Sequence, residues 1–134
     1  MLLVDDSPHD QALIRSAFNR IGSGAVVDTA PDVGVAIGMI EGGLRPVLTI
    51  VDLGLVGESG LELVDWIRNE SEVPWLPIVV LSGSDDTADL RAAHASGANA
   101  YLVKPGSVEE VDDLIRRIDA FWLGASAFAA ELSH

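Results

Sequence analysis

Short apolar runs alternate with longer amphipathic segments along the chain. Three of the runs are almost continuously apolar and rich in strand-forming residues: 2–4, 47–51 and 78–81. This pattern is typical of strands that helices cover on both faces of a sheet. Two weaker strand candidates, 25–27 and 100–103, are expected nearer the edges of the sheet.

The amphipathic segments between these runs carry apolar residues at helical spacing. We expect the first helix to begin at Ser7-Pro8, a capping residue followed by proline, and to end at Gly22. Further helical patterns cover residues 35–40, 61–67, 86–96 and 111–122. A strand followed by a helix, repeated five times, predicts an α/β fold with an open parallel sheet and helices on both sides.

Polar side chains stand where the predicted strands end: Asp5, Asp6, Asp52, Ser82 and Lys104. Because parallel strands place their carboxyl ends at one edge of the sheet, these side chains are expected to converge there. Singly, each has a simpler explanation, since an aspartate often caps a helix and Lys-Pro often forms a turn. Their shared position at the strand ends is what indicates a functional site.

The chemistry of this set favours phosphoryl transfer. Three carboxylates that lie close together repel one another and need a compensating cation. Mg²⁺ suits them, because it prefers carboxylates, waters and phosphate oxygens as ligands. Lys104 would donate to a phosphate oxygen, as would the hydroxyl of Ser82 with help from main-chain N–H groups around Gly83. An aspartate can itself accept the phosphoryl group and form an acyl phosphate.

Composition and charge narrow the class of protein further. The chain has 134 residues, of which 49% are hydrophobic, so one compact domain with a real core is expected. Its formal net charge of -13 opposes binding to the phosphates of DNA or RNA. It has no cysteine, no basic leader and no apolar stretch of the roughly 20 residues that a membrane helix needs. We expect a soluble cytoplasmic protein without membrane insertion, whose partners are other proteins.

The chain resembles the response-regulator receiver family of two-component signalling over roughly residues 2–122. The motifs that carry the resemblance are Leu2-Leu3-Val4-Asp5-Asp6-Ser7-Pro8, Asp52-Leu53-Gly54-Leu55 with Gly60, Leu81-Ser82-Gly83 and Tyr101-Leu102-Val103-Lys104-Pro105. The resemblance implies a flavodoxin-like, doubly wound (βα)5 fold with strand order 2-1-3-4-5. It also implies a receiver domain over residues 1–123 and a short extension over 124–134, with no separate output domain.

The resemblance implies a role for each residue of the metal site. Asp52 would accept the phosphoryl group from a sensor histidine kinase. The carboxylates of Asp6 and Asp52 and the backbone carbonyl of Gly54 would bind Mg²⁺, and Asp5 would hold the ion mainly through a bound water.

Ser82 and Lys104 would contact the phosphoryl oxygens, and Tyr101 would pair with Ser82 as a switch. As the phosphoryl group draws Ser82 inward, the tyrosine ring would turn from exposed to buried and change the face formed by the fourth helix, fifth strand and fifth helix. A downstream protein target would bind that face. The simpler interpretation of Tyr101 is an edge residue whose hydroxyl stays in water.

Two departures from the family pattern affect loops. Val56 stands where the family usually has proline, and Gly83 replaces the more common alanine. Both should loosen their loops, which affects loop mobility and the lifetime of the phosphoryl group.

The chain is also similar to small single-domain receivers that partner bacterial phytochrome kinases. The likeness lies in residues 6–10 with 13–15, in residues 101–105 and in Phe121-Trp122-Leu123. It implies that the phosphodonor is a phosphohistidine of a light-sensing kinase.

The end of the chain has two interpretations. The apolar residues 120–123 and Phe128 form either a last helical turn that packs on its own domain or a homodimer or partner surface through the last helix and the tail. His9, His94 and His134 are dispersed, and we assign them no metal and no catalysis.

Three rival functions remain open. Phosphatases with an aspartate nucleophile typically have a second acid two residues later, where this chain has Gly54. A redox module of flavodoxin type would need a phosphate loop rich in hydroxyls and glycine after the first strand. A degenerate receiver would normally have lost one of the five polar groups. The favoured interpretation is a stand-alone phosphoacceptor that catalyses its own phosphorylation and hydrolysis and is not an enzyme acting on external substrates.

Overall fold

The computed structural model describes residues 1–123, in which strands and helices alternate in the predicted order. The strands are β1 (Leu2–Val4), β2 (Asp28–Ala30), β3 (Thr49–Asp52), β4 (Ile78–Ser82) and β5 (Ala100–Val103). The helices are α1 (Pro8–Ile21), α2 (Val33–Glu41), α3 (Leu61–Asn69), α4 (Thr87–Ser96) and α5 (Val108–Ile118), and a π-helical turn over Asp119–Leu123 continues α5. The strands pair in parallel in the order β2-β1-β3-β4-β5, which confirms the predicted doubly wound α/β fold.

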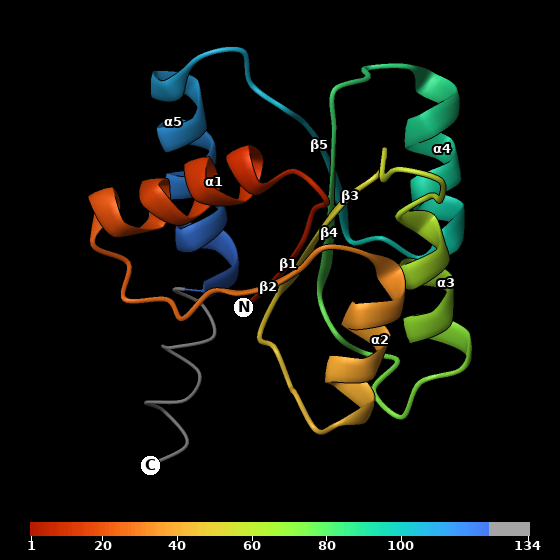
Figure 1. The fold of residues 1–134 in the computed structure, drawn as a ribbon. Coiled ribbons are helices and arrows are strands. Elements are labelled where there is room, and N and C mark those ends of the chain that lie inside the picture. The colour runs from red at the N-terminus through yellow and green to blue at the C-terminus, as the bar shows by residue number, and fades with distance from the viewer. Residues whose placement is uncertain (124–134) are drawn as a thin grey trace.

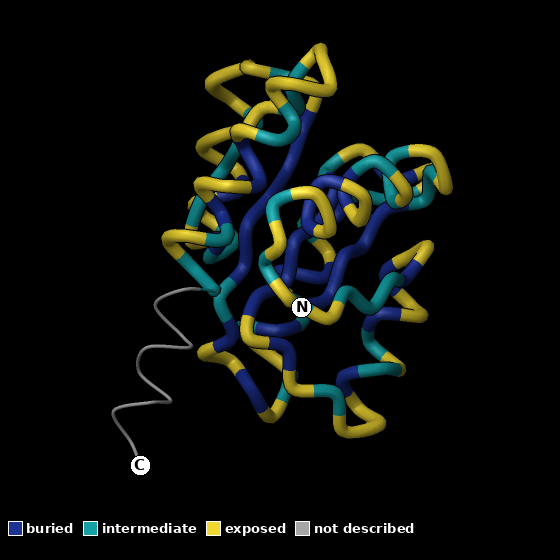
Figure 2. The backbone as a smooth tube through the Cα atoms, turned by 90° about the vertical axis from the view of Figure 1, so that its left-hand side faces the viewer, coloured by how far each residue is buried: buried dark blue, intermediate teal, exposed yellow. Residues whose placement is uncertain are grey.

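Helices cover both faces of the sheet, as Figure 1 shows: α1 and α5 lie on one face, and α2, α3 and α4 on the other. Alternate residues of a strand therefore enter different cores. Leu3 packs with Phe18 and Ile115 beneath α1 and α5, whereas Leu2 packs with Leu63 beneath the other three helices. Because neither face meets water, the central strands are buried along their length (Figure 2), which explains their continuous apolar sequence.

The first helix begins and ends where the sequence predicted. The Ser7 side chain accepts a hydrogen bond from the Asp10 N–H at 3.2 Å, and Pro8 is the first helical residue, where it needs no donor. Gly22 ends the helix with φ of 68°, a left-handed conformation that glycine adopts without strain. The helix therefore starts three residues after Asp5, so its first turn lies at the edge of the sheet where β1 ends.

The second strand lies three residues later than predicted. The sequence favoured the apolar run 25–27, but β2 covers Asp28–Ala30, and Asp28 pairs with Leu2. The Val26 side chain is exposed, and its carbonyl accepts a hydrogen bond from the amino terminus of Met1 at 2.8 Å. An edge strand has one neighbour and one partly open face, so it does not need the apolar character on which the prediction relied.

The third strand is also displaced slightly, since it begins at Thr49 rather than residue 47 and includes Asp52. Asp52 pairs with Leu81 of β4, so a strand in the middle of the sheet fixes its main chain. Within residues 1–123, no helix is long and apolar enough to cross a membrane. The predicted extension over 124–134, including Phe128 and His134, lies outside the described residues.

Candidate functional site

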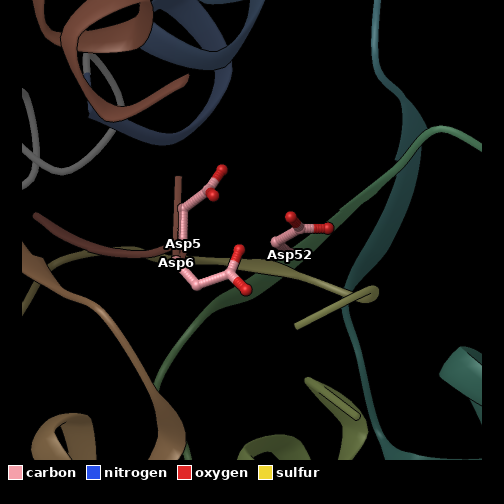
Figure 3. A group of neighbouring side chains, drawn as sticks. All are labelled: Asp5, Asp6 and Asp52. Carbon is pink, nitrogen blue, oxygen red and sulfur yellow. The ribbon is translucent and has the colours of Figure 1, made fainter. Parts of the chain in front are cut away.

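Three aspartates meet at the carboxyl edge of the sheet, as the sequence predicted (Figure 3). Asp5 and Asp6 follow β1 directly, and Asp52 is the last residue of β3. One carboxylate oxygen from each of the three lies within 4.8 Å of the others. Asp5 is 1% exposed and Asp52 is 8% exposed, so much of this acidic charge is withdrawn from water.

Lys104, the only lysine of the chain, follows β5 and reaches into this cluster. Its Nζ lies 2.9 Å from Asp52 Oδ2 and 3.5 Å from Asp5 Oδ2. Burial disfavours the charged ammonium, but hydrogen bonds to Asp52 and Asp10 outweigh this effect and raise the pKa of Lys104. The ammonium therefore stays charged at neutral pH and compensates part of the acidic charge.

Asp5 is held in place by the residues that follow it in the chain. Its Oδ1 accepts the Ser7 N–H at 2.9 Å, and its main-chain carbonyl accepts a hydrogen bond from the Gln11 side chain. Burial raises the pKa of Asp5, more than the Ser7 N–H and Lys104 lower it. A charged Asp5 is therefore costly unless a cation is close.

The loop after β3 supplies main-chain donors to two of the acids. The Gly54 N–H donates to Asp52 Oδ1 at 3.0 Å, and the Val56 N–H donates to Asp6 Oδ2 at 2.7 Å. Residue 56 stands where the family resemblance led us to expect proline, which has no N–H to donate. A residue other than proline at position 56 thus adds a hydrogen bond to Asp6, a candidate metal ligand, and the sequence did not predict this bond.

Ser82 and Tyr101 are linked through the loop after β4. Ser82 is the last residue of β4, and its Oγ accepts the Ser84 N–H at 3.1 Å. The Tyr101 hydroxyl donates to the Ser84 carbonyl at 2.6 Å, and the ring, half-buried, packs against the core beneath α4. The tyrosine hydroxyl is therefore bound to the protein in this structure, in contrast to the simpler interpretation in which it stays in water.

One residue of the site was missed by sequence reasoning. Asp10, in the first turn of α1, places its Oδ2 3.1 Å from Lys104 Nζ. The signal that could have found it is its position: an acid in the first helical turn after Asp5-Asp6 emerges at the same edge of the sheet.

The donor set fits a hard divalent cation. Three carboxylates with one nearby lysine leave a net negative charge, and the nearly complete burial of Asp5 makes that charge costly. Each of the three side chains offers a carboxylate oxygen, which is the ligand type that Mg²⁺ prefers. The geometry thus fits the predicted Mg²⁺ through the donor chemistry of Asp5, Asp6 and Asp52.

A comparison with protein families decides what kind of domain this is. The family model "Response regulator receiver domain" matches residues 1–116. The chain is a member of this receiver family. Receiver domains work in two-component signalling, where they receive a phosphoryl group from a histidine kinase, and they bind Mg²⁺ or Mn²⁺ at an acidic pocket.

Relatives of known sequence and structure agree with this assignment. The receiver is 33% identical over 129 residues to a probable methanogenesis regulatory protein, FilR2, of Methanothrix harundinacea, covering 92% of this chain and 83% of FilR2. It is 27% identical over 134 residues to response regulator Rcp1 of Synechocystis sp., covering 92% of this chain and 88% of Rcp1. Rcp1 has been crystallised in a Mn²⁺-bound form, which matches with a TM-score of 0.78 and 26% identity over 91% of this chain and 92% of that one.

A second structural relative is the phosphorylated cyanobacterial phytochrome response regulator RcpA. The match has a TM-score of 0.82 and 25% identity, and it covers 92% of this receiver and 93% of RcpA. Chemotaxis response regulators are also among the structural neighbours, with the same arrangement of five strands and five helices.

Proposed function

We propose that this receiver accepts a phosphoryl group on Asp52 from a phosphohistidine of a sensor histidine kinase, in a Mg²⁺-dependent reaction. The observation that carries the proposal is the contact of 2.9 Å between Lys104 Nζ and Asp52 Oδ2, beside two further aspartates. A carboxylate with both a cation-binding group and a fixed ammonium at its side has what an acceptor needs. Such sites work mainly by positioning and charge neutralisation.

In the proposed transfer, a carboxylate oxygen of Asp52 forms the new bond to phosphorus as the bond from phosphorus to the kinase imidazole breaks. The imidazole leaves with the electron pair. Asp6, Asp52 and the Gly54 carbonyl would hold the Mg²⁺, with Asp5 acting mainly through a water. When bound, the ion supplies positive charge next to the phosphoryl oxygens.

Lys104 and Ser82 would stabilise the transferred group. The Lys104 ammonium would donate to one phosphoryl oxygen, and the Ser82 hydroxyl would donate to another. Hydrolysis of the acyl phosphate at the same site would reset the protein. The chain would then act on no external substrate, and Gly54, which has no side chain, cannot supply the second acid typical of aspartate-nucleophile phosphatases.

The proposed switch runs from Ser82 to Tyr101. Ser82 Oγ bonds the Ser84 N–H, and the Ser84 carbonyl bonds the Tyr101 hydroxyl. A phosphoryl oxygen that recruits the Ser82 hydroxyl would shift the loop that anchors the tyrosine, and with it the face formed by α4, β5 and α5. A protein target that binds one arrangement better would read the phosphorylation state.

The kinase that we infer is of the phytochrome type, because the relative RcpA is a phytochrome response regulator and the chain shares motifs with such receivers. The test is transfer from several phosphorylated histidine kinases to the wild type and to Asp52→Asn. Fast transfer to the wild type, with no transfer to Asp52→Asn, supports the role of Asp52 as acceptor. Equal rates from all kinases would remove the phytochrome link and leave the acceptor role in place.

A second candidate function is the formation of a homodimer through the last helix, next to the face formed by α4, β5 and α5. Phe121 is exposed and stacks edge-on against Trp122, with ring centroids 4.9 Å apart. An exposed aromatic group beside α5 is suited to protein contact. The solution mass of the full chain, compared with a chain that ends at Leu123, tests whether the last helix or the tail contributes to a dimer.

A further inference from the structure

We propose that Asp10 is a positioning residue that holds the Lys104 ammonium at the site throughout phosphoryl transfer. The proposal rests on the function proposed above and names a residue that acts through Lys104 rather than on the phosphoryl group itself.

Three carboxylates surround Lys104 Nζ within residues 1–123: Asp52 at 2.9 Å, Asp10 at 3.1 Å and Asp5 at 3.5 Å. Two of them, Asp52 and Asp5, belong to the cluster that would bind the cation. Asp10 stands outside that cluster. It is therefore the partner that Lys104 can keep when the cluster changes its charge.

Phosphorylation changes the strongest of these contacts. When Asp52 becomes an acyl phosphate, its carboxylate charge is lost, and the negative charge lies on the phosphoryl oxygens farther along the side chain. Lys104 must then leave the aspartate oxygen and find a phosphoryl oxygen. A lysine side chain has many rotamers, so an ammonium without an anchor samples many positions.

Asp10 is placed to be that anchor. It is the third residue of α1, and the Ser7 side chain fixes its N–H at 3.2 Å. The Asp10 carboxylate is half-buried and hydrogen-bonded to Lys104 Nζ. Because an ammonium has three N–H donors, one can stay on Asp10 while the others move from Asp52 to the phosphoryl oxygens.

A carboxylate in the first turn of a helix also stabilises the helix itself, and the chain offers a matched control for that effect. Asp89 is the third residue of α4, which begins after the capping residue Asp86 as α1 begins after Ser7. It makes none of the ion pairs found within residues 1–123. Asp89→Ala therefore reports the loss of a first-turn acid alone, while Asp10→Ala also removes the anchor of Lys104.

The experiment measures the rate of phosphorylation by acetyl phosphate at saturating Mg²⁺. Asp10→Ala is expected to be about tenfold slower than the wild type, the size expected when a group that positions a charge is lost. Asp10→Asn, which keeps a side-chain acceptor oxygen for Lys104, should recover part of the rate, and Asp89→Ala should match the wild type. In a Lys104→Ala background, Asp10→Ala should cause no further loss, because its effect passes through Lys104.

A second readout follows Lys104 directly. Because the chain has one lysine, labelling with ¹⁵N-lysine gives a single side-chain ammonium signal. With Mg²⁺ and beryllofluoride, a mimic of the phosphoryl group, the wild type should keep this signal protected from exchange with water. Asp10→Ala should lose the protection, and Asp89→Ala should not.

Two results would overturn the role of Asp10 and leave the proposed function in place. One is a wild-type rate of phosphorylation in both Asp10→Ala and Asp10→Asn. The other is a loss of rate from Asp10→Ala that is as large in the Lys104→Ala background as in the wild type. If Asp10→Ala is unfolded, Asp10→Asn carries the comparison. A wild-type protein that takes up no phosphoryl group and binds no beryllofluoride would overturn the proposed function, and the role of Asp10 with it.

Discussion

A Cβ atom at Gly60 would lie 2.2 Å from the main-chain oxygen of Asp52. It would also lie 3.0 Å from a methyl group of Val51, and the Gly60 N–H donates to the Leu53 carbonyl at 3.1 Å. The turn before α3 therefore packs directly on the end of β3. The position of the Asp52 main chain, and with it the proposed acceptor carboxylate, depends on a residue without a side chain at 60.

Gly60→Ala is expected to destabilise the protein and to disturb the site at once. Because the clash is with main-chain atoms, β3 or the turn has to move, and we expect a loss of about 2–3 kcal/mol in the free energy of unfolding. Urea unfolding measures the loss, and calorimetric titration with Mg²⁺ should show weaker binding. The control is Gly38→Ala in α2, where a methyl group meets open space, and which should stabilise the protein by about 0.5–1 kcal/mol. Unchanged stability in Gly60→Ala would contradict the packing described.

The Val56 N–H is expected to weaken cation binding. It draws negative charge from the Asp6 carboxylate, which makes that carboxylate a weaker ligand for a cation. Val56→Pro removes the donor, and we expect Mg²⁺ to bind about fivefold more tightly, which corresponds to about 1 kcal/mol. Val56→Ala keeps the N–H, and the native side chain is 86% exposed, so this control should bind like the wild type. Equal affinities in the proline and alanine variants would show that the donor has no such effect.

Asp5 is expected to cost stability in the absence of a cation. Burial raises its pKa above the ordinary value of 3.8, so between the two values the folded protein binds more protons than the unfolded chain. The free energy of unfolding then falls as the pH rises through that interval. With a chelator at pH 7, Asp5→Asn should be more stable than the wild type by about 1 kcal/mol, and the gain should shrink as the pH approaches 3.8. Urea unfolding at several pH values measures this, and an equal gain at every pH would exclude the burial of charge as its cause.

The single tyrosine makes the proposed switch directly observable. Labelling with fluorotyrosine gives one ¹⁹F signal, which reports the surroundings of the Tyr101 ring. We expect Mg²⁺ with beryllofluoride to move this signal in the wild type, and Ser82→Ala to abolish most of the change, because the Ser82 hydroxyl is the start of the link to Ser84 and Tyr101. A full change in Ser82→Ala would mean that the tyrosine responds by another route.

Strand ends made much of the site predictable. The apolar runs located β1, β3, β4 and β5 closely enough to place Asp5, Asp6, Asp52, Ser82 and Lys104 at one edge of the sheet, because side chains that follow parallel strands emerge together. The structure brings the three acids and Lys104 into contact distance. Their roles in metal binding and phosphoryl transfer stay predictions.

The pattern of apolar residues could not predict three features of the structure. β2 was misplaced because an edge strand can be polar, and its pairing with β1 sets its position. The contact between Asp10 and Lys104 joins residues 94 positions apart, and it depends on the direction in which α1 leaves the sheet. The Val56 N–H belongs to the main chain, so the identity of its side chain gives no hint of the hydrogen bond to Asp6.

The most direct test of the account is the intact mass of the protein after incubation with acetyl phosphate, with and without Mg²⁺, for the wild type and Asp52→Asn. The account predicts one added phosphoryl group on the wild type when Mg²⁺ is present, and none on Asp52→Asn or without the ion. An adduct that forms equally well on Asp52→Asn would contradict the assignment of the acceptor. No adduct under any condition, together with no binding of beryllofluoride, would mean a receiver fold that acts through protein binding alone.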